Sequence, residues 1–204
     1  MGMRIGPKYK IARRLGEKIF SKCQTTKFAT SGSDQRKTGR RTTVSEYGRQ
    51  LLEKQKARYT YCVSEKQFSN YIKKARAKHG VNPSLEVYKH LETRLDNVVF
   101  RLGLTISRSF ARQIISHGHI LVNGKKITIA SYVVKVGDKI SVREQSKAKG
   151  LFRDLEERLK NYKEPDWMIF DEKKLTGEIK KLPEHTEGES TINFSSILEF
   201  YSRV

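Results

Sequence analysis

Two arginines one helical turn apart, Arg108 and Arg112, are the residues whose chemistry is easiest to infer from this sequence. At about 100° per residue they share one face of a helix with Ser116. A guanidinium group can bind two phosphate oxygens at once, so this face suits a phosphate-rich ligand. Ser107 and Ser109 begin the same segment, where unpaired backbone N–H groups of a helix also attract phosphate. The opposite face is apolar and is expected to pack on a core; it consists of Phe110, Ala111, Ile114 and Ile115.

A β-hairpin is expected directly after this helix. Asn123-Gly124 separates two apolar runs within 119–127, and both residue types tolerate the positive φ that a type I′ turn requires. The tip presents Lys125 and Lys126 beside the helix. Helix face and hairpin tip are therefore predicted to form a two-part cationic cradle, with an ordinary solvated charged surface as the alternative.

The charge of the whole chain agrees with an anionic partner. The 204 residues contain 42 Lys and Arg against 22 Asp and Glu, which gives a net charge of +20. The imbalance is uneven: residues 1–90 carry 22 basic against 6 acidic side chains, 91–150 carry 11 against 4, and 151–204 carry 9 against 12. Nucleic acid is the preferred partner, because the sequence has no lipidation signal and no basic amphipathic helix with a broad aromatic face.

Several other protein classes are excluded. No apolar run approaches the roughly 20 residues of a membrane span, and the charged start of the sequence leads us to expect no secretory signal. Two cysteines, Cys23 and Cys62, provide neither a disulfide framework nor a four-thiolate zinc site. We therefore predict no metal and no cofactor.

Residues upstream and around Gly118 extend the candidate site. Arg94 and Arg101, seven residues apart, are expected on one helical face, with Asp96 orienting an arginine. His117 and His119 either stack on RNA or are ordinary exposed turn residues. The complete set of predicted RNA-contacting residues is Arg94, Asn97, Arg101, Ser107, Arg108, Arg112, Gln113, Ser116, His117, His119, Asn123, Lys125, Lys126, Lys54, Lys56, Arg58, Tyr71 and Lys73. Tyr71 can equally belong to the core.

The elements that must position these residues follow from caps and periodicity. Helices are predicted over 45–59, 64–79 and 82–102, beginning at Ser45, at a Ser64–Gln67 capping box and at Pro83. Residues 1–43 are basic and lack apolar periodicity, and an extended N-terminal segment is expected. Within it, 25–43 is predicted to be a loop that is either disordered or folded only against a partner.

The second half of the chain is predicted to hold strands as well. Residues 104–144 form a compact α+β unit, whose strands include 132–136 and 139–143. A short helix over 151–159 and a strand pair at 165–171 and 175–179 follow, and 197–201 is apolar enough to pack on the protein.

These predictions give an α+β fold: a helical domain carrying a compact α+β RNA-binding module and a basic extended N-terminal segment. The expected parts are an extension at 1–44, a helical domain at 45–92 and the module at 93–155. A final segment at 156–204 is expected to pack its helix and strand pair back on the helical domain.

The sequence resembles the bacterial and organellar form of the small-subunit ribosomal protein four family. The resemblance rests on Tyr47-Gly48, Glu53-Lys54-Gln55-Lys56, Gln67-Phe68, Asn70-Tyr71, 94–103 (RLDNVVFRLG), Val122-Asn123-Gly124, Ile129-Ala130-Ser131-Tyr132 and 198–202 (LEFYS), all in the family's order. It implies a primary rRNA-binding protein that binds the 5′ domain of 16S rRNA and nucleates assembly of the 30S body. It also implies contact with small-subunit ribosomal protein five, a place at the mRNA entry channel and an influence on decoding accuracy. Localisation would be cytoplasmic, in the ribosome, or in an organelle ribosome, with no homo-oligomer.

Two features depart from the family pattern. Some members carry a four-cysteine zinc site near the N-terminus, where this sequence has only Cys23. The usual Gly-Gln-His-Gly motif is replaced by Thr38-Gly39-Arg40-Arg41. The resemblance still places Lys37, Arg40 and Arg41 near the mRNA path.

Two alternative functions were weighed. Arg94-Leu95-Asp96 superficially matches the aspartate context of pseudouridine synthases, but no catalytic domain of adequate size remains and neither cysteine has a histidine partner for nucleophilic chemistry. An RNA chaperone that binds stalled ribosomes would be shorter and would lack the helical domain. We therefore predict a protein that is not an enzyme.

Overall fold

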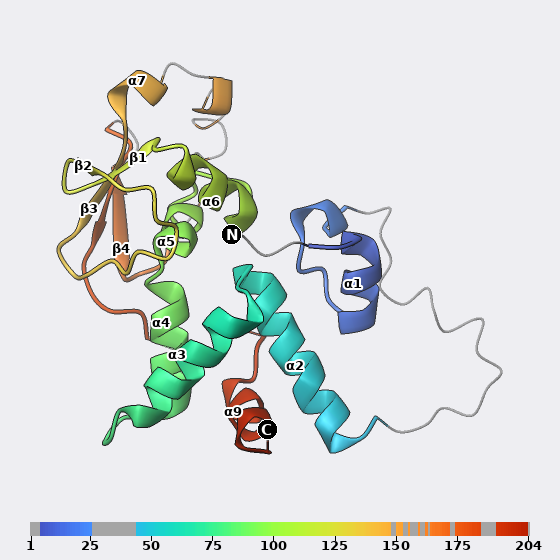
Figure 1. Ribbon diagram of the computed structural model, residues 1–204. Coiled ribbons are helices and arrows are strands. Elements are labelled where there is room, and N and C mark those ends of the chain that lie inside the picture. Colours follow the sequence, from blue (N-terminus) through green and yellow to red (C-terminus); the bar gives the residue numbers. More distant parts are fainter. Residues whose placement is uncertain are drawn as a thin grey trace. The chain divides into compact units, whose positions relative to one another are not determined.

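A computed structural model describes residues 5–25, 44–147, 150–152, 155, 159, 162, 164–171, 174–184 and 191–203. The chain forms two compact units, one made of Met1–Val87 with His185–Val204 and the other of Tyr88–Glu184. The first unit is helical, and the second combines helices with an antiparallel sheet (Figure 1). The predicted α+β class is confirmed. Within the described ranges, no helix has the length and apolar character needed to cross a bilayer.

The helical unit begins its main helices where the caps predict. Helix α2 (Glu46–Tyr61) starts after Ser45, whose hydroxyl accepts a 3.2 Å hydrogen bond from the Gly48 amide. Helix α3 (Glu65–Ala77) starts after Ser64, whose hydroxyl accepts from the Gln67 amide at 3.4 Å. Phe68, Tyr71, Ile72 and Ala75 form the buried face of α3, as the spacing predicts.

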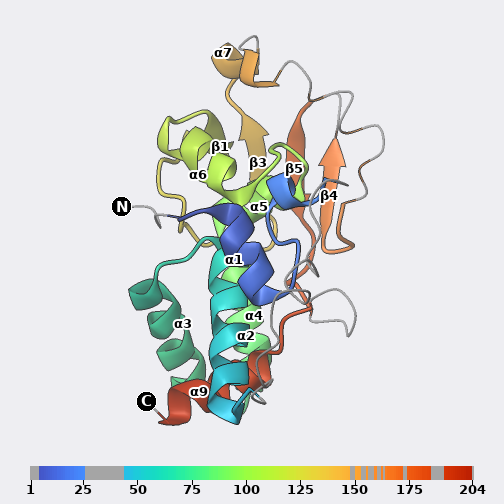
Figure 2. The same ribbon diagram turned by 90° about the vertical axis from the view of Figure 1, so that its right-hand side faces the viewer.

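The C-terminal helix α9 (Phe194–Arg203) packs on this unit, as its apolar residues predict. Figure 2 shows α9 beside α2. The ring of Phe200 lies 5.3 Å from that of Tyr47, centroid to centroid. Arg76 of α3 donates to the backbone carbonyls of Leu198 and Tyr201 at the end of α9. Carbonyls at a helix C-terminus lack partners within the helix, so this guanidinium caps α9.

The prediction of an extended N-terminal segment is wrong for residues 5–25, whereas nearly all of the loop predicted at 25–43 lies outside the described residues. This range contains α1 (Lys8–Leu15) and the 3₁₀ helix η1 (Ser21–Cys23). Ala12, Phe20 and Cys23 are buried together, with Tyr59 packed against them. A 2.5 Å ion pair joins Glu17 to Lys56 of α2. The apolar residues are too few for a core of their own, so α2 supplies the rest of it.

The single helix predicted over 82–102 is in fact two helices, α4 (Pro83–Glu92) and α5 (Leu95–Arg101). Arg94 is extended between them, with φ −69° and ψ 137°. The break is held by a distant segment: the Leu95 amide donates to Tyr132 O and the Val134 amide donates to Thr93 O. Apolar periodicity continues through the break, so the sequence gives no sign of it.

The second unit places α5 and α6 (Arg108–Ser116) with a five-stranded sheet of order β2-β1-β3-β5-β4. The hairpin of β1 (Ile120–Val122) and β2 (Lys125–Lys126) is confirmed, and Asn123 and Gly124 have φ of 50° and 76°. Strand β3 (Lys139–Val142) is also confirmed. The strand predicted at 132–136 is wrong: it makes one isolated bridge, Val133 with Arg94, because its backbone bonds go to the α4–α5 break.

The predicted strand pair near the C-terminus exists as β4 (Met168–Asp171) and β5 (Thr176–Ile179). The prediction that it packs on the helical domain is wrong. Strand β5 pairs with β3, so both strands extend the sheet of the second unit, which continues to Glu184 instead of ending at 155. Short helices α7 (Glu144–Lys147) and η3 (Gly150–Phe152) precede this pair. Part of the helix predicted over 151–159 lies outside the described residues, but Leu155 and Leu159 are buried in the same core.

Candidate nucleic-acid interface

Helix α6 presents the two faces that its sequence predicts. Ser107 caps the helix by accepting a 3.3 Å hydrogen bond from the Phe110 amide. Ala111, Ile114 and Ile115 are buried in the core of the unit, and Phe110 packs against it. Arg108 and Arg112 are half-buried and project toward residues of α5.

Side chains of α5 hold both arginines in place. Nε of Arg108 donates to Oδ1 of Asn97 at 2.7 Å, and its guanidinium carbon lies 4.4 Å from the centroid of the Phe100 ring. Nε and Nη2 of Arg112 donate to Oδ2 of Asp96 at 3.2 and 2.7 Å. The direction of each cation is therefore set by the protein before any ligand binds.

Asp96 lies between two guanidinium groups. Arg94 donates to both of its carboxylate oxygens, at 2.9 and 2.7 Å, while Arg112 approaches Oδ2. The carboxylate is only 1% exposed. A buried charge needs this degree of pairing, because removal from water costs several kcal/mol per ion. Asp96 thus orients an arginine, as the sequence predicts.

Glu92 is a second buried carboxylate that is bonded to an arginine. Its carboxylate accepts two 3.1 Å hydrogen bonds from Arg101 and one of 2.8 Å from the Asn97 amide. We call the connected set the buried ion network; it consists of Glu92, Arg94, Asp96, Asn97, Arg101, Arg108 and Arg112.

The network corrects two predicted RNA contacts. Arg94 and Asn97 are each 1% exposed, so the predicted direct contact of these side chains with RNA is wrong. Arg94 also precedes α5 and does not share a helical face with Arg101. Both residues position other cations, whereas Arg101 and Arg112, at 27% and 20% exposure, keep part of their surface available.

The hairpin tip provides two of the exposed cations of this unit. Lys125 and Lys126 are exposed on β2. Gln113, Ser116 and His117 are exposed at the end of α6 and in the turn after it. Asn123 has a structural role, because its side chain bonds to Asp138 at 2.8 Å and to the Lys139 amide at 2.9 Å.

In the helical unit, most of the predicted contacts are buried. Lys54 bonds to Glu65 and lies 4.6 Å from the centroid of the Phe200 ring, and Lys56 pairs with Glu17. Tyr71 belongs to the core face of α3. Direct RNA contact by Lys54, Lys56 and Tyr71 is therefore wrong, since burial removes their side chains from a ligand. Arg58 pairs with Glu65 at 2.7 Å, and Lys73 is exposed.

Comparisons with known proteins identify both units. Residues 3–92 match the family model for the ribosomal protein S4/S9 N-terminal domain, and residues 93–140 match the S4 domain. The chain is 44% identical to small ribosomal subunit protein uS4 of Roseiflexus castenholzii over 100% of both chains. It is 42% identical to uS4 of Natranaerobius thermophilus and 45% identical to uS4 of Oenococcus oeni, with 97% or more of each chain covered.

The chain belongs to the uS4 family of small-subunit ribosomal proteins. The predicted family is thereby confirmed. The uS4 S4 domain, as matched here, contains α5, α6 and the β1–β2 hairpin, and hence all of the buried ion network except Glu92.

Other predicted features of this uS4-family chain lie elsewhere. Lys37, Arg40 and Arg41, the predicted mRNA-channel residues, are outside the described residues. No group of three or more potential metal ligands occurs among the residues that the structure describes. Burial raises the pKa of the Cys23 thiol, which disfavours the thiolate that metal binding needs.

Sequence reasoning missed one set of exposed cations. They lie on α1 and consist of Lys8, Lys10, Arg13 and Arg14. The missed signal is the pair Pro7 and Gly16, which bracket the helix; Gly16 has φ 73° at the C-cap. Proline at the start and glycine just past the end of a segment are typical of a short helix.

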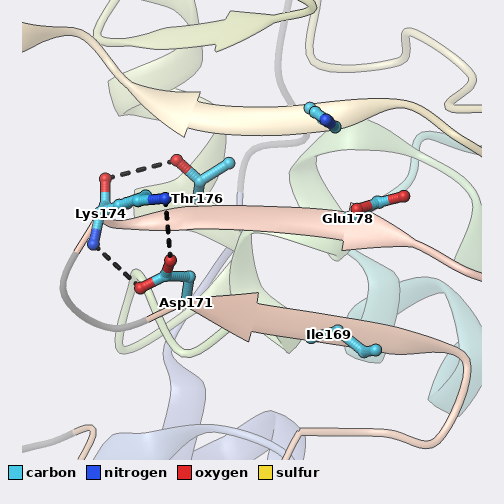
Figure 3. Close-up of a pocket in the computed structure, with 6 residues that line it drawn as sticks. Ile169, Asp171, Lys174, Thr176 and Glu178 are labelled. Atoms are coloured by element: carbon cyan, nitrogen blue, oxygen red, sulfur yellow. Dashed lines mark hydrogen bonds and ion pairs between the residues drawn. The ribbon is translucent and has the colours of Figure 1, made fainter.

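A hollow on the sheet has the wrong charge for phosphate. It is lined by Lys139, Ile169, Asp171, Lys174, Thr176 and Glu178 (Figure 3). Asp171 accepts from the Lys174 amide at 3.1 Å, and Glu178 and Lys180 form a 3.5 Å ion pair. Carboxylates offset the lysines here, whereas the hairpin tip carries two lysines. We call this part of the sheet, with Lys180, the mixed-charge face.

Proposed function

We propose that this chain is a structural protein of the small ribosomal subunit that binds 16S rRNA directly and catalyses no reaction. The observation that carries the proposal is identity above 40% over the full length of uS4 proteins from several bacteria. The net charge of +20 and the cations held by the buried ion network support the same conclusion.

The geometry favours recognition of RNA shape and phosphate. A side chain that reads an A-form helix reaches the shallow groove and the backbone, where fixed cations are more useful than a catalytic pocket. Arg101, Arg108 and Arg112 are fixed cations of this kind, and Lys125 and Lys126 are exposed cations of the same unit. Asp96, the aspartate of the enzyme alternative, is buried between two arginines and unable to reach a uridine.

The family resemblance supports more specific proposals about the rRNA ligand, the role in assembly and the neighbouring molecules. We propose the 5′ domain of 16S rRNA as the ligand, nucleation of 30S body assembly as the role, and small-subunit ribosomal protein five as a neighbour. Lys37, Arg40 and Arg41 are proposed to approach mRNA at the entry channel and so to influence accuracy. The proposed location is the cytoplasmic or organellar ribosome.

Salt dependence of binding tests the RNA-binding surface. The purified chain is titrated against a transcript of the 16S 5′ domain between 50 and 200 mM salt. Replacing Lys125 and Lys126 together by alanine is expected to weaken binding and to flatten the slope of log K against log salt by about two units. The matched control replaces Lys174 and Lys180 by alanine, which removes the same charge from the mixed-charge face. Equal slopes for the two double variants would overturn the proposed surface.

Co-sedimentation tests the structural role. A subunit component stays with small subunits through a high-salt wash at about one copy each, because many phosphate contacts must break together. Release of the protein by the wash would instead indicate a transient factor.

A further inference from the structure

A small pocket lies at the end of α6, outside the buried ion network. It is lined by Phe110, Gln113, Ile114, His117, His119 and Leu151. The first three come from α6, the histidines from the turn that follows, and Leu151 from η3. Among the residues that the structure describes, no carboxylate, lysine or arginine lines it, so this lining suits an uncharged group. Its lining of rings and aliphatic side chains, together with one amide, suits a flat heterocycle.

The two histidine rings are held parallel at its edge. Their planes differ by 11° and their centroids are 6.2 Å apart. A hydrogen bond of 2.9 Å between Nδ1 of His119 and Oγ of Ser146 fixes the second ring. Gly118 makes this turn possible with φ 73°, and the His119 amide donates back to Ile114 O at 3.0 Å. Flat side chains in a fixed direction are what stacking on a nucleobase requires.

A cation lies against the turn that carries the two histidines. A Cβ built on Gly118 would be 2.0 Å from Cε and 2.9 Å from Nζ of Lys126, so the lysine stem crosses the turn between the histidines. The described lining of the pocket is thus uncharged, and a cation lies against the turn that carries both of its histidines. A nucleotide has the complementary distribution, with an uncharged base and an anionic phosphate.

We propose that this pocket receives a single unstacked nucleobase of the bound rRNA. The His117 ring stacks on the base, the exposed Gln113 amide provides a donor and an acceptor for its edge, and Lys126 meets the adjacent phosphate. The inference rests on the proposed function and adds to it a contact with a base, where the rest of the surface contacts phosphate. An apolar side chain of a neighbouring protein is the competing occupant, but it would leave the Gln113 amide and Lys126 without a role.

The test compares two ring variants at one position. With the full chain and the 16S 5′-domain transcript, His117→Ala is expected to weaken binding about 5- to 150-fold, the range found for loss of one stacked base. His117→Phe keeps a flat ring and is expected to stay close to the unaltered protein. Because stacking releases no counterions, the slope of log K against log salt is expected to remain unchanged in both. His79→Ala, at another exposed histidine, is the control.

A second arm identifies the base. Transcripts that each lack one base are bound to the unaltered protein and to His117→Ala. At the base that occupies the pocket, the two proteins should bind the abasic transcript equally, because the missing base and the missing ring remove the same contact. Equal affinity of His117→Ala and the unaltered protein for the transcript would overturn the base pocket. A defect of His117→Ala that appears only in incorporation into subunits would also overturn it, and would assign the pocket to a protein neighbour. Failure of the proposed function is distinct, because then the unaltered chain itself would not bind the transcript.

Discussion

The phenol of Tyr201 donates a 2.5 Å hydrogen bond to Oε1 of Glu65, which ties the C-terminal helix to the start of α3. Lys54 donates to the same oxygen at 3.1 Å, and Arg58 pairs with Oε2 at 2.7 Å. Residues from α2, α3 and α9 therefore share one carboxylate. Together with the Arg76 cap, this arrangement explains how α9 remains part of the same unit as α3, through hydrogen bonds between residues 125 and 136 positions apart.

Loss of the phenol is expected to loosen this attachment. Tyr201→Phe should lower the free energy of unfolding by about 1 to 2 kcal/mol, because a hydrogen bond to a charged group is lost while the ring remains. Urea denaturation measures the change. Tyr47→Phe is the matched control, since its ring also packs on Phe200 and its hydroxyl is exposed. Equal losses in the two variants would contradict a specific role for the Tyr201 hydroxyl.

The same pair is expected to make stability depend on pH at both extremes. Burial, followed by the hydrogen bond to Glu65, raises the pKa of Tyr201 above its ordinary 10.0. Burial opposes the charge of Glu65, but hydrogen bonds from Tyr201 and Lys54 and the charge of Arg58 lower its pKa below 4.5. The unfolded chain thus loses the tyrosine proton first as pH rises, and gains the glutamate proton first as pH falls.

The contribution of Tyr201 is therefore full below about pH 10 and is lost above it, whereas that of Glu65 is full above about pH 4.5 and is lost below it. Unfolding curves at several pH values should show the defect of Tyr201→Phe shrinking above pH 10 and that of Glu65→Gln shrinking below pH 4.5. A defect of constant size across pH would contradict the coupling.

Local signals in the sequence predicted local structure well. The caps Ser45, Ser64 and Ser107 and the Asn123-Gly124 turn act within a few residues, and the structure has each of them. The break at Arg94 was not predictable, because it depends on backbone bonds from residues 130–134 that the chain reaches only after folding. The pairing of β5 with β3 is equally non-local.

In the candidate site, too, local spacing was predictable and contacts between distant residues were not. The spacing of Arg108 and Arg112 predicted their shared side of α6. It did not predict that Asn97 and Asp96 would hold their guanidinium groups, nor that both cations would be partly buried. Lys54 and Lys56 were misassigned for the related reason that a lysine stem packs well on apolar surface, and burial is invisible in charge alone.

The centre of the buried ion network is expected to be critical for stability. Asp96→Asn keeps the shape of the side chain but removes the negative charge that Arg94 and Arg112 share, and loss of one partner of a buried pair costs about 3 to 5 kcal/mol. Urea denaturation measures the loss. Asp166→Asn, at an exposed aspartate, should stay within about 0.5 kcal/mol of the unaltered protein. Similar stabilities for the two variants would refute the energetic importance of the network.

Close packing of β5 on α5 makes a final prediction about two glycines. A Cβ on Gly177 would lie 2.6 Å from both δ carbons of Leu102, which is fully buried, whereas a Cβ on Gly150 meets nothing within 4 Å. Gly177→Ala should therefore lower the free energy of unfolding by about 1 to 3 kcal/mol through overpacking. Gly150→Ala should be neutral or slightly stabilising, because it restricts the unfolded chain without a clash.

A double variant shows whether the clash is the cause. Leu102→Ala alone is expected to cost about 2 to 5 kcal/mol through the cavity that it leaves. Combined with Gly177→Ala, it removes the δ carbons that the new methyl group would meet, so the methyl group partly fills the cavity. The loss in the double variant should then be smaller than the sum of the two single losses, as thermal and urea unfolding would show. Simple additivity would mean that Gly177 is needed for a reason other than its contact with Leu102.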